Sequence, residues 1–261
     1  MLPLKFKPKY EYEVTRLGGD NDGGYLVGKK SIEKSMSLLT LGLGYEWRFE
    51  KDYYKLKQSP IICFDHSISY SSVKKISRKY FFSYIFRIFK PKYFLKKNFF
   101  KNLFYNIFLY SDYKKFFKNN VHHEKIKVGS CQKEINLETI LKHKNLSFPC
   151  LLKVDIEGSE YRILDEIIKL QSHFTGIIIE FHDIDLHITT ILNFIDKLNF
   201  DLIHIHPQNP APVTTNNIPT QIEFTFSKNE KILGSNPKFP HKLDMPANPN
   251  YEEIDLIFND K

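Results

Sequence analysis

The sequence predicts an α/β fold built on an open sheet, and three observations carry this prediction. Short apolar runs recur along the chain, several of them end on a glycine turn or an acidic residue, and helical patterns separate them. The clearest unit is the apolar run Cys150–Val154, which ends on Asp155 and Glu157 and precedes a helical pattern from Tyr161 onward. Ligands of such sheets collect at the carboxyl ends of the strands. The alternative is that both carboxylates only cap the helix.

Length and cysteine content predict one cytoplasmic domain. At 261 residues, the chain can form a single α/β domain of residues 1–261 with a substantial core and an insertion. We expect no transmembrane helix, because long uncharged apolar runs are absent, and residues 1–5 lack the apolar core of a signal peptide. Cys63, Cys131 and Cys150 are far apart and odd in number, which predicts free thiols in a reducing cytosol.

The net charge of +8 is unevenly distributed along the chain. Residues 74–118 contain thirteen Lys and Arg against the single acid Asp112, a balance of +12, so the remainder totals −4. The surrounding segment, residues 72–120, interleaves Lys with Phe and Tyr and lacks glycine, which predicts a basic insertion of two or more helices.

The role of this insertion has several interpretations. Basic-aromatic segments bind nucleic acid, anionic lipid surfaces or phosphate-bearing substrates. We favour a helical cap whose aromatic residues pack on the sheet or on a second subunit, while the lysines face water. In either case we expect it to cover the carboxyl edge of the sheet, because it leaves the chain just past Asp65.

A glycine-rich segment near the start is the first candidate for ligand contact. Two glycine pairs flank residues 20–22, and a short strand-like stretch, Gly24–Val27, follows. Glycine permits close approach of a ligand, which makes Asp22, Gly23 and Gly24 candidates. The alternative is a plain β-hairpin with a tight turn.

A second glycine turn follows the apolar strand Ser37–Leu41. The order of strand, Gly42-Leu-Gly44 and helix start brings backbone N–H groups to a ligand. The third glycine of a dinucleotide fingerprint is missing, because that position is Trp47. A nicotinamide enzyme is therefore disfavoured.

The next strand, Ile61–Phe64, ends on Asp65. An acidic residue about twenty positions after a glycine turn suits hydrogen bonding to both hydroxyls of a ribose. The alternative is a helix-capping carboxylate. The third strand is predicted at His122–Val128, where His122 and His123 point to opposite sides and so do not form a metal site.

A cluster of titratable residues is predicted at the end of the strand Gly176–His182. Glu180 interrupts its apolar run, and a charge in a buried strand is costly unless it is paired or used. Glu180 and His182 share a face, and Asp155 and Glu157 lie on a neighbouring strand tip. This set can remove a proton from an alcohol or hold a divalent ion. The alternative is a structural ion pair.

The rest of the chain completes the sheet. We expect a helix at Thr189–Leu198, a strand at Asp201–His206, an antiparallel seventh strand at Thr220–Phe226 and a short last strand at Ile254–Phe258.

These motifs together resemble the FkbM-type S-adenosylmethionine-dependent methyltransferases over residues 10–70 and 125–260, with the basic insertion outside the resemblance. The matching motifs are Gly42-Leu-Gly44, Asp65, Lys153-Val-Asp-Ile-Glu-Gly-Ser-Glu160, Ile179-Glu-Phe-His182 and Glu223-Phe-Thr-Phe226. The segments Gly19-Asp-Asn-Asp-Gly-Gly-Tyr25 and Asp244-Met-Pro-Ala-Asn-Pro249 resemble a bacterial subgroup associated with surface polysaccharide.

The resemblance implies a Rossmann-like sheet of seven, mostly parallel strands with S-adenosylmethionine over the carboxyl ends. Carried over by position, Gly42 and Gly44 approach the methionine end of this donor, and Asp65 binds its ribose. The turn of Asp22, Gly23 and Gly24 closes over the same cofactor.

The resemblance also implies O-methylation, often of a sugar hydroxyl. We expect His182 or Asp155 as the base, with Glu180 orienting it. The competing arrangement is a divalent metal held by Asp155 with Glu180 or His182, which would lower the pKa of the hydroxyl. The sequence does not choose between them.

We therefore predict a carbohydrate O-methyltransferase acting on a nucleotide-linked or phosphorylated precursor of capsule or lipopolysaccharide. The insertion then supplies cations for phosphates and a lid against water, contacts an anionic membrane at its inner face, or joins two copies in a homodimer. One rival is an RNA methyltransferase, disfavoured because the motif after the fourth strand is Asp-Ile-Glu-Gly. The other rival is a non-catalytic module that docks on a membrane or a partner.

Overall fold

The computed structural model describes residues 1–88, 99–129 and 131–259. Its centre is a seven-stranded sheet with the strand order β10-β11-β9-β8-β5-β6-β7. These strands are β5 (Ser37–Leu41), β6 (Ile61–Phe64), β7 (Val121–Glu124), β8 (Cys150–Val154), β9 (Phe174–Phe181), β10 (Asp201–Pro207) and β11 (Ile222–Ser227). All are parallel except β11, which runs antiparallel to both its neighbours. The predicted fold class is confirmed.

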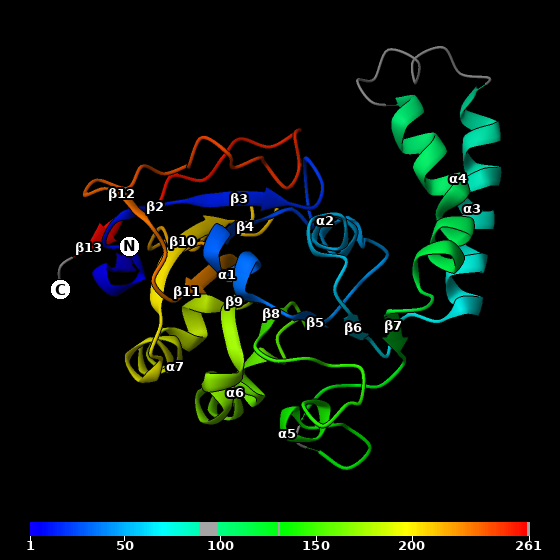
Figure 1. Cartoon of the computed structure of the whole chain (residues 1–261). Helices are drawn as coiled ribbons and strands as arrows, with labels where there is room; N and C mark the ends of the chain where they lie inside the picture. The colour runs from blue at the N-terminus through cyan, green and yellow to red at the C-terminus, as the bar shows by residue number, and fades with distance from the viewer. Residues whose placement is uncertain (89–98, 130, 260–261) are drawn as a thin grey trace.

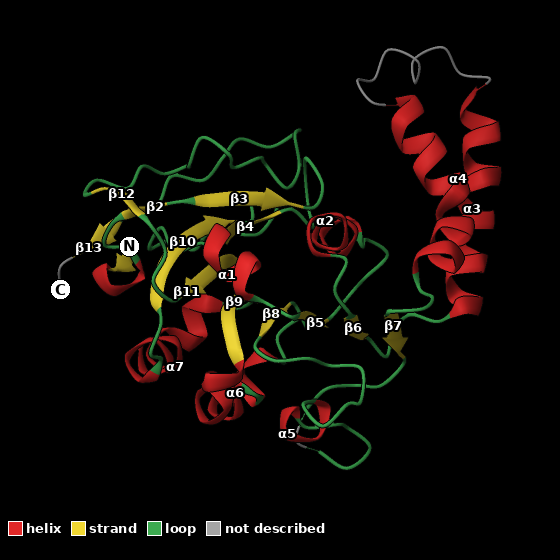
Figure 2. Ribbon diagram, in the orientation of Figure 1, coloured by secondary structure: helices red, strands yellow, loops and turns green. Residues whose placement is uncertain are grey.

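Helices cover both faces of this sheet (Figure 2). Leu39 and Leu152 point to one face, which is covered by the helices α5 (Leu137–Ile140), α6 (Leu164–Leu170) and α7 (Ile184–Lys197). Leu38 and Leu151 point to the other face, which is covered by α1 (Lys29–Lys34) and α2 (Arg48–Lys57). Because both faces are buried, the central strands are continuous apolar runs in the sequence.

The glycine-rich segment forms the loop of a β-hairpin. Strands β3 (Val14–Leu17) and β4 (Tyr25–Gly28) pair antiparallel, so the plain hairpin is present and residues 18–24 are its loop. The hydroxyl of Thr225 donates to the carbonyl of Leu26 at 2.7 Å and ties the hairpin to β11. The short outer pairs are β1 (Leu2–Pro3) with β13 (Phe258–Asn259) and β2 (Glu11–Tyr12) with β12 (Ile232–Gly234).

A helical hairpin of α3 (Tyr70–Ile88) and α4 (Phe99–Phe116) stands clear of the sheet beyond β7 (Figure 1). Helices were expected within residues 72–120, and both are present; residues 89–98 lie outside the described part. The base of this α3–α4 hairpin is tied to the body because Asp112 accepts hydrogen bonds from Trp47 Nε1 at 2.8 Å and Lys51 Nζ at 2.6 Å. The assignment of residues 72–120 as an insertion stays a prediction. Within the described ranges, we find no helix with the length and apolar character to cross a membrane.

Four predicted boundaries are wrong. The helix predicted from Thr189 begins five residues earlier, at Ile184. The strand His122–Val128 stops at Glu124, where the carbonyl accepts a bond from the N–H of Ile126 and the chain turns. The predicted strand Ile254–Phe258 is absent except for Phe258, the first of the two residues in β13. The helix expected soon after Asp155 begins only at Leu164, because left-handed residues and a 3₁₀ turn precede it.

Candidate active site

The carboxyl ends of β5, β6 and β8 meet at one edge of the sheet. The N–H of Gly42 donates to the carbonyl of Phe64 at 2.9 Å, and the N–H of Asp155 donates to the carbonyl of Leu41 at 2.8 Å. The central strand β5 therefore places the glycine turn directly between the tips that carry Asp65 and Asp155.

Gly42 is required by this close approach. Its φ is +85°, and a Cβ there would overlap the carbonyl oxygen of Asp155. Gly44 also has a positive φ, of +59°. Glycine permits close approach here, as expected from the sequence, but the group that approaches Gly42 is the carbonyl of Asp155 and not a ligand.

Asp65 binds the glycine turn with its carboxylate. Oδ2 accepts from the N–H groups of Leu43 at 2.9 Å and Gly44 at 3.0 Å, and Oδ1 accepts from the N–H and hydroxyl of Ser67. Burial alone would raise the pKa of Asp65, but the bonds from Ser67, Leu43 and Gly44 outweigh it and lower the pKa. Asp65 is therefore ionised and fixed in place.

A cavity of about 130 Å³ lies at this edge. It is lined by Gly42, Phe64, Asp65, His66, Ser67, Ile126, Lys127, Val128, Asp155, Ile156, Glu157 and Ser159. No residue from the described part of the α3–α4 hairpin is among them, so the expected cover by the insertion is not seen at this cavity. Pockets for small ligands usually occupy about 300–1,000 Å³, so the surrounding loops must move apart to admit a nucleoside.

The residue types at this edge fit an adenosyl ligand. The turn at Gly42 brings backbone to the cavity wall. The carboxylate of Asp65 already accepts four hydrogen bonds, which fill its four lone-pair sites, so a ribose hydroxyl would have to replace one of these donors. Both features lie at strand tips on the cavity wall, where α/β sheets bind nucleotides.

Beside the cavity, Tyr25 bridges the two strand tips that carry acids. Its hydroxyl lies 3.1 Å from Asp155 Oδ2 and 3.1 Å from Glu180 Oε2. The buried Lys153 ammonium is 3.8 Å from Asp155 Oδ2. Burial opposes the charge of Lys153, yet Asp155, Glu50 and Glu180 raise its pKa overall, so it remains a cation beneath the site.

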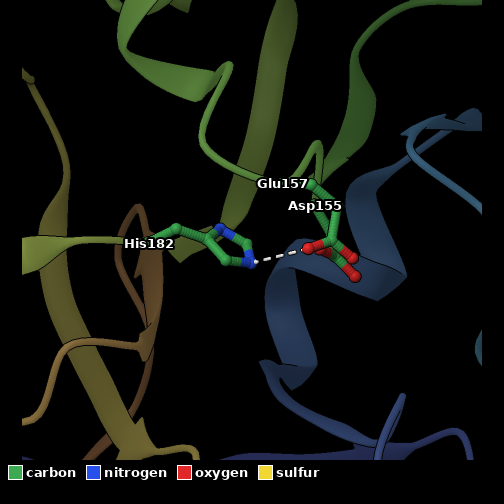
Figure 3. A group of neighbouring side chains, drawn as sticks. All are labelled: Asp155, Glu157 and His182. Carbon is green, nitrogen blue, oxygen red and sulfur yellow. Dashed lines mark ion pairs between the residues drawn. The ribbon is translucent and has the colours of Figure 1, made fainter. Parts of the chain in front are cut away.

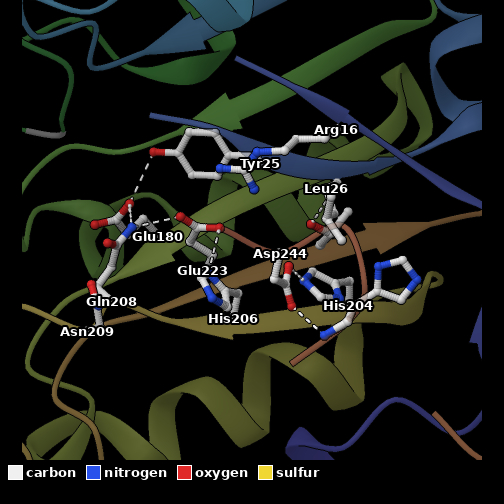
Figure 4. Close-up of polar contacts among 12 residues, drawn as sticks. Arg16, Tyr25, Leu26, Glu180, His204, His206, Gln208, Asn209, Glu223 and Asp244 are labelled. Atoms are coloured by element: carbon white, nitrogen blue, oxygen red, sulfur yellow. Dashed lines mark hydrogen bonds and ion pairs between the residues drawn. The ribbon is translucent and has the colours of Figure 1, made fainter. Parts of the chain in front are cut away.

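Glu180 belongs to a buried polar array that leads away from Asp155 (Figure 4). Gln208 Nε2 donates to Glu180 at 3.3 Å and to Glu223 at 2.7 Å, while Gln221 Nε2 donates to Glu180 at 2.6 Å. Burial and the charge of Asp155 raise the pKa of Glu180 to about 8. Glu180 is therefore mostly protonated at neutral pH.

His182 is held by Glu160, which the sequence analysis named only as part of a matching motif. Glu160 is fully buried, and its Oε1 accepts from the His182 backbone N–H at 2.8 Å and lies 3.1 Å from Nδ1. Burial lowers the pKa of His182, but Glu160, Glu180 and Asp155 outweigh it and raise the pKa to about 9. The imidazole is therefore a cation at neutral pH.

Asp155, Glu157 and His182 form a compact group of possible metal ligands (Figure 3). One ligand atom from each lies within 4.8 Å of the others. His182 Nε2 is buried, has no hydrogen-bond partner in the described part of the chain, and lies 3.4 Å from Glu157 Oε2. The structure therefore brings Glu157 into the group of possible metal ligands, where the sequence analysis expected Glu180 or His182 beside Asp155.

The loop of residues 18–24 reaches the same cluster. The charge of Asp155 adds to desolvation in raising the pKa of Asp22. The N–H of Asp22 donates to the carbonyl of Ala247 at 3.1 Å, and Asn21 Nδ2 donates to that of Pro246 at 3.3 Å. The two motifs near the opposite ends of the chain are thus in direct contact.

Sequence reasoning missed Tyr25, Lys153 and Glu160. Lys153 could have been found, because it interrupts the apolar strand β8 as Glu180 interrupts β9. Tyr25 and Glu160 had no such signal, since each acts on a partner distant in the chain.

His122 and His123 are half-buried. His123 Nε2 is 3.0 Å from the carbonyl of Asp65, and its Nδ1 is 2.6 Å from the hydroxyl of Tyr113. His123 thereby connects the base of the α3–α4 hairpin to the tip of β6.

Residues 91–202 match the model of the methyltransferase FkbM domain. The match covers less than half of the chain and contains Asp155, Glu157, Glu160, Glu180 and His182. It starts inside the segment assigned to the insertion and leaves out the glycine turn and Asp65. A search of curated proteins finds no match.

Two solved structures show a distant similarity to this chain. Precorrin-6y C5,15-methyltransferase from Geobacter metallireducens GS-15 has a TM-score of 0.40 at 12% identity, covering 81% of this chain and 98% of its own. The fibrillarin pre-rRNA processing protein of Methanococcus jannaschii has a TM-score of 0.37 at 9% identity, covering 86% of each chain. At these scores, neither bears on function.

Replacing Gly42 by alanine should abolish binding at this edge. The added Cβ would push Asp155 away from β5, so we expect a free energy of unfolding lower by several kcal/mol and no calorimetric signal with S-adenosylhomocysteine. Gly158→Ala is the matched control, because Gly158 has the same φ of +85° but open space around it. Equal effects of both substitutions would show that backbone strain alone is responsible.

Removing the charge of Glu160 should lower the pKa of His182. Burial of the imidazole lowers its pKa, and in Glu160→Gln the largest opposing charge is gone. We therefore expect the pKa of His182 to fall from about 9 toward the ordinary value near 6.5. Titration of the ring by NMR measures this directly. A pKa unchanged in Glu160→Gln would mean that Glu180 and Asp155 set the charge state.

Proposed function

We propose that the chain is an S-adenosylmethionine-dependent methyltransferase, which the match to the FkbM domain supports, and that it methylates a hydroxyl of a sugar. The acceptor in this proposal is a nucleotide-linked or phosphorylated precursor of capsule or lipopolysaccharide. The observation that carries the proposal is the position of Asp155, which touches the glycine turn on one side and the Tyr25–Glu180 pair on the other.

The acceptor side of the site is rich in hydrogen-bonding groups. Asp155, Glu157 and Asp22 offer oxygen acceptors to hydroxyl donors, whereas a phosphate placed among them would be repelled. This favours the sugar ring, rather than a phosphate, next to Asp155. A linked phosphate would lie farther out.

Asp155 is our choice for the base. His182 is protonated at neutral pH and therefore has no lone pair for a proton, and Glu180 is mostly neutral. The hydroxyl of Tyr25 and the ammonium of Lys153 orient the carboxylate of Asp155. S-adenosylmethionine would supply the methyl group, with Gly42, Gly44 and Asp65 holding it and the turn of Asp22, Gly23 and Gly24 closing over it.

A divalent metal held by Asp155, Glu157 and His182 is the competing arrangement. Two carboxylates and one imidazole are a suitable ligand set, and a metal would lower the pKa of the acceptor hydroxyl. Loss of the His182 proton would have to accompany metal binding.

We place the reaction in the cytoplasm. No described residue of the α3–α4 hairpin lines the cavity, so the hairpin is better suited to an outside contact than to the phosphates of a bound acceptor. In this proposal its contact is either an anionic membrane or a second copy of the chain.

The donor should stabilise the protein before any acceptor is known. At a concentration one hundred times Kd, a ligand adds about 2.7 kcal/mol to the free energy of unfolding, which raises Tm by several degrees. Asp65→Ala should abolish this shift, whereas Asp165→Ala, which removes an exposed carboxylate on α6, should retain it. If neither S-adenosylmethionine nor its demethylated product shifts Tm, the methyltransferase proposal fails. Turnover on a panel of nucleotide sugars, with RNA as the rival, then tests the acceptor class.

The pH profile should separate the two candidate bases. With His182 as base, the rate should rise about tenfold per pH unit until about pH 9, so a rate without this rise would exclude His182 as the base. Asp155→Asn should lower kcat by about 10²–10⁴-fold with donor binding intact. A rate abolished by chelator and restored by Mg²⁺ or Mn²⁺ would support the metal arrangement instead.

A further inference from the structure

The sequence of the α3–α4 hairpin is rich in Lys and Arg, and almost no acidic residue balances their charge. The only acid among residues 74–118 is Asp112, and both of its oxygens are bonded inward, to Trp47 and Lys51. The described cations among residues 74–118 are all exposed, namely Lys74, Lys75, Arg78, Lys79, Lys114, Lys115 and Lys118, while the rest of the chain is net negative.

Large aromatic side chains are exposed on the same helices. Phe81 and Phe82 on α3 are 43% and 59% exposed, with ring centroids 5.6 Å apart, and Phe108 on α4 is 57% exposed. Lys75, Arg78 and Lys79 are exposed one to two helical turns before this pair. Phenylalanine on a surface beside cations is typical of elements that lie in a membrane interface.

The fold holds this surface away from the body. The nineteen residues of α3 span about 28 Å, and the hairpin stands clear of the sheet in Figure 1. Its base is fixed by the buried Val73 and Leu109, and Ser77 Oγ donates to the carbonyl of Ile107 at 2.8 Å between the two helices. The exposed residues are therefore carried on a firm support.

We infer that the α3–α4 hairpin docks the enzyme on an anionic lipid surface. Lys75, Arg78 and Lys79 meet the headgroups, and the rings of Phe81 and Phe82 enter the boundary with the acyl chains. A symmetric dimer through this hairpin would bring two strongly positive surfaces together, which disfavours a second copy as the partner. The negative remainder is repelled from the membrane, so the enzyme attaches by the hairpin alone.

Flotation of the full chain with vesicles tests this inference. We expect binding to vesicles of phosphatidylcholine with one quarter phosphatidylglycerol, and none to pure phosphatidylcholine. Binding should fall between 0.1 M and 1 M salt, as the screening length drops from about 10 Å to about 3 Å. The assay requires neither donor nor acceptor, so its result is independent of the proposed methyl transfer.

Two variants, each with a matched control, test which residues of the hairpin bind the vesicles. Lys75→Gln/Arg78→Gln/Lys79→Gln should weaken binding at least about tenfold, whereas Lys231→Gln/Lys238→Gln/Lys242→Gln removes the same charge from the C-terminal segment without effect. Phe81→Ser/Phe82→Ser should weaken binding about tenfold or more, whereas Leu56→Ser/Leu186→Ser, which alters exposed apolar residues on α2 and α7, should not. The Tm of each variant confirms folding.

Three outcomes would overturn the inference. Equal binding to neutral and anionic vesicles would remove the electrostatic basis. Loss of binding in the control variants to the same degree would show a nonspecific charge effect. Light scattering that finds a dimer dissolved by Phe81→Ser/Phe82→Ser, or tight RNA binding without vesicle binding, would identify another partner for the hairpin.

Discussion

The contact between the glycine turn and the backbone of Asp155 is the constraint on which the site depends. Gly42 lies against the carbonyl of Asp155, and the N–H of Asp155 bonds the end of β5. This contact connects the sheet edge at Asp65, where we propose that a nucleoside binds, with the group around Asp155, where we propose that a proton is transferred. Because both ends are backbone groups of parallel strands, their relative position does not depend on flexible side chains.

The concentration of carboxylates around Asp155 has an electrostatic consequence. Gathering acids in a partly buried site costs free energy, and the raised pKa values of Glu180 and Glu223 reflect that cost. Lys153 below and His182 beside the cluster offset part of it with positive charge. A cationic ligand or a metal would offset more, so the apo site is electrostatically prepared for a positive group.

Two regions outside the sheet, the loop of residues 18–24 and the α3–α4 hairpin, lie near different parts of the candidate site. The loop of residues 18–24 and the segment after Asp244 meet over the acidic cluster and can shape the acceptor site. Among the described residues, the base of the α3–α4 hairpin contacts the cavity edge, where His123 links Tyr113 to Asp65. The proposed methyl transfer and the proposed membrane contact therefore use different parts of the molecule.

The sequence by itself determined the parts of this protein that depend on neighbours in the chain. The apolar runs of β5, β6 and β8, the turn at Gly42 and the acids at the strand tips follow from local periodicity and from backbone sterics. Only the tertiary structure decided the partners of the reactive groups. Tyr25 and Asp155 are 130 positions apart, and Glu160 reaches His182 only after β9 has taken its place beside β8. Charge states such as that of His182 depend on burial and on those distant charges, and local sequence carries no record of either.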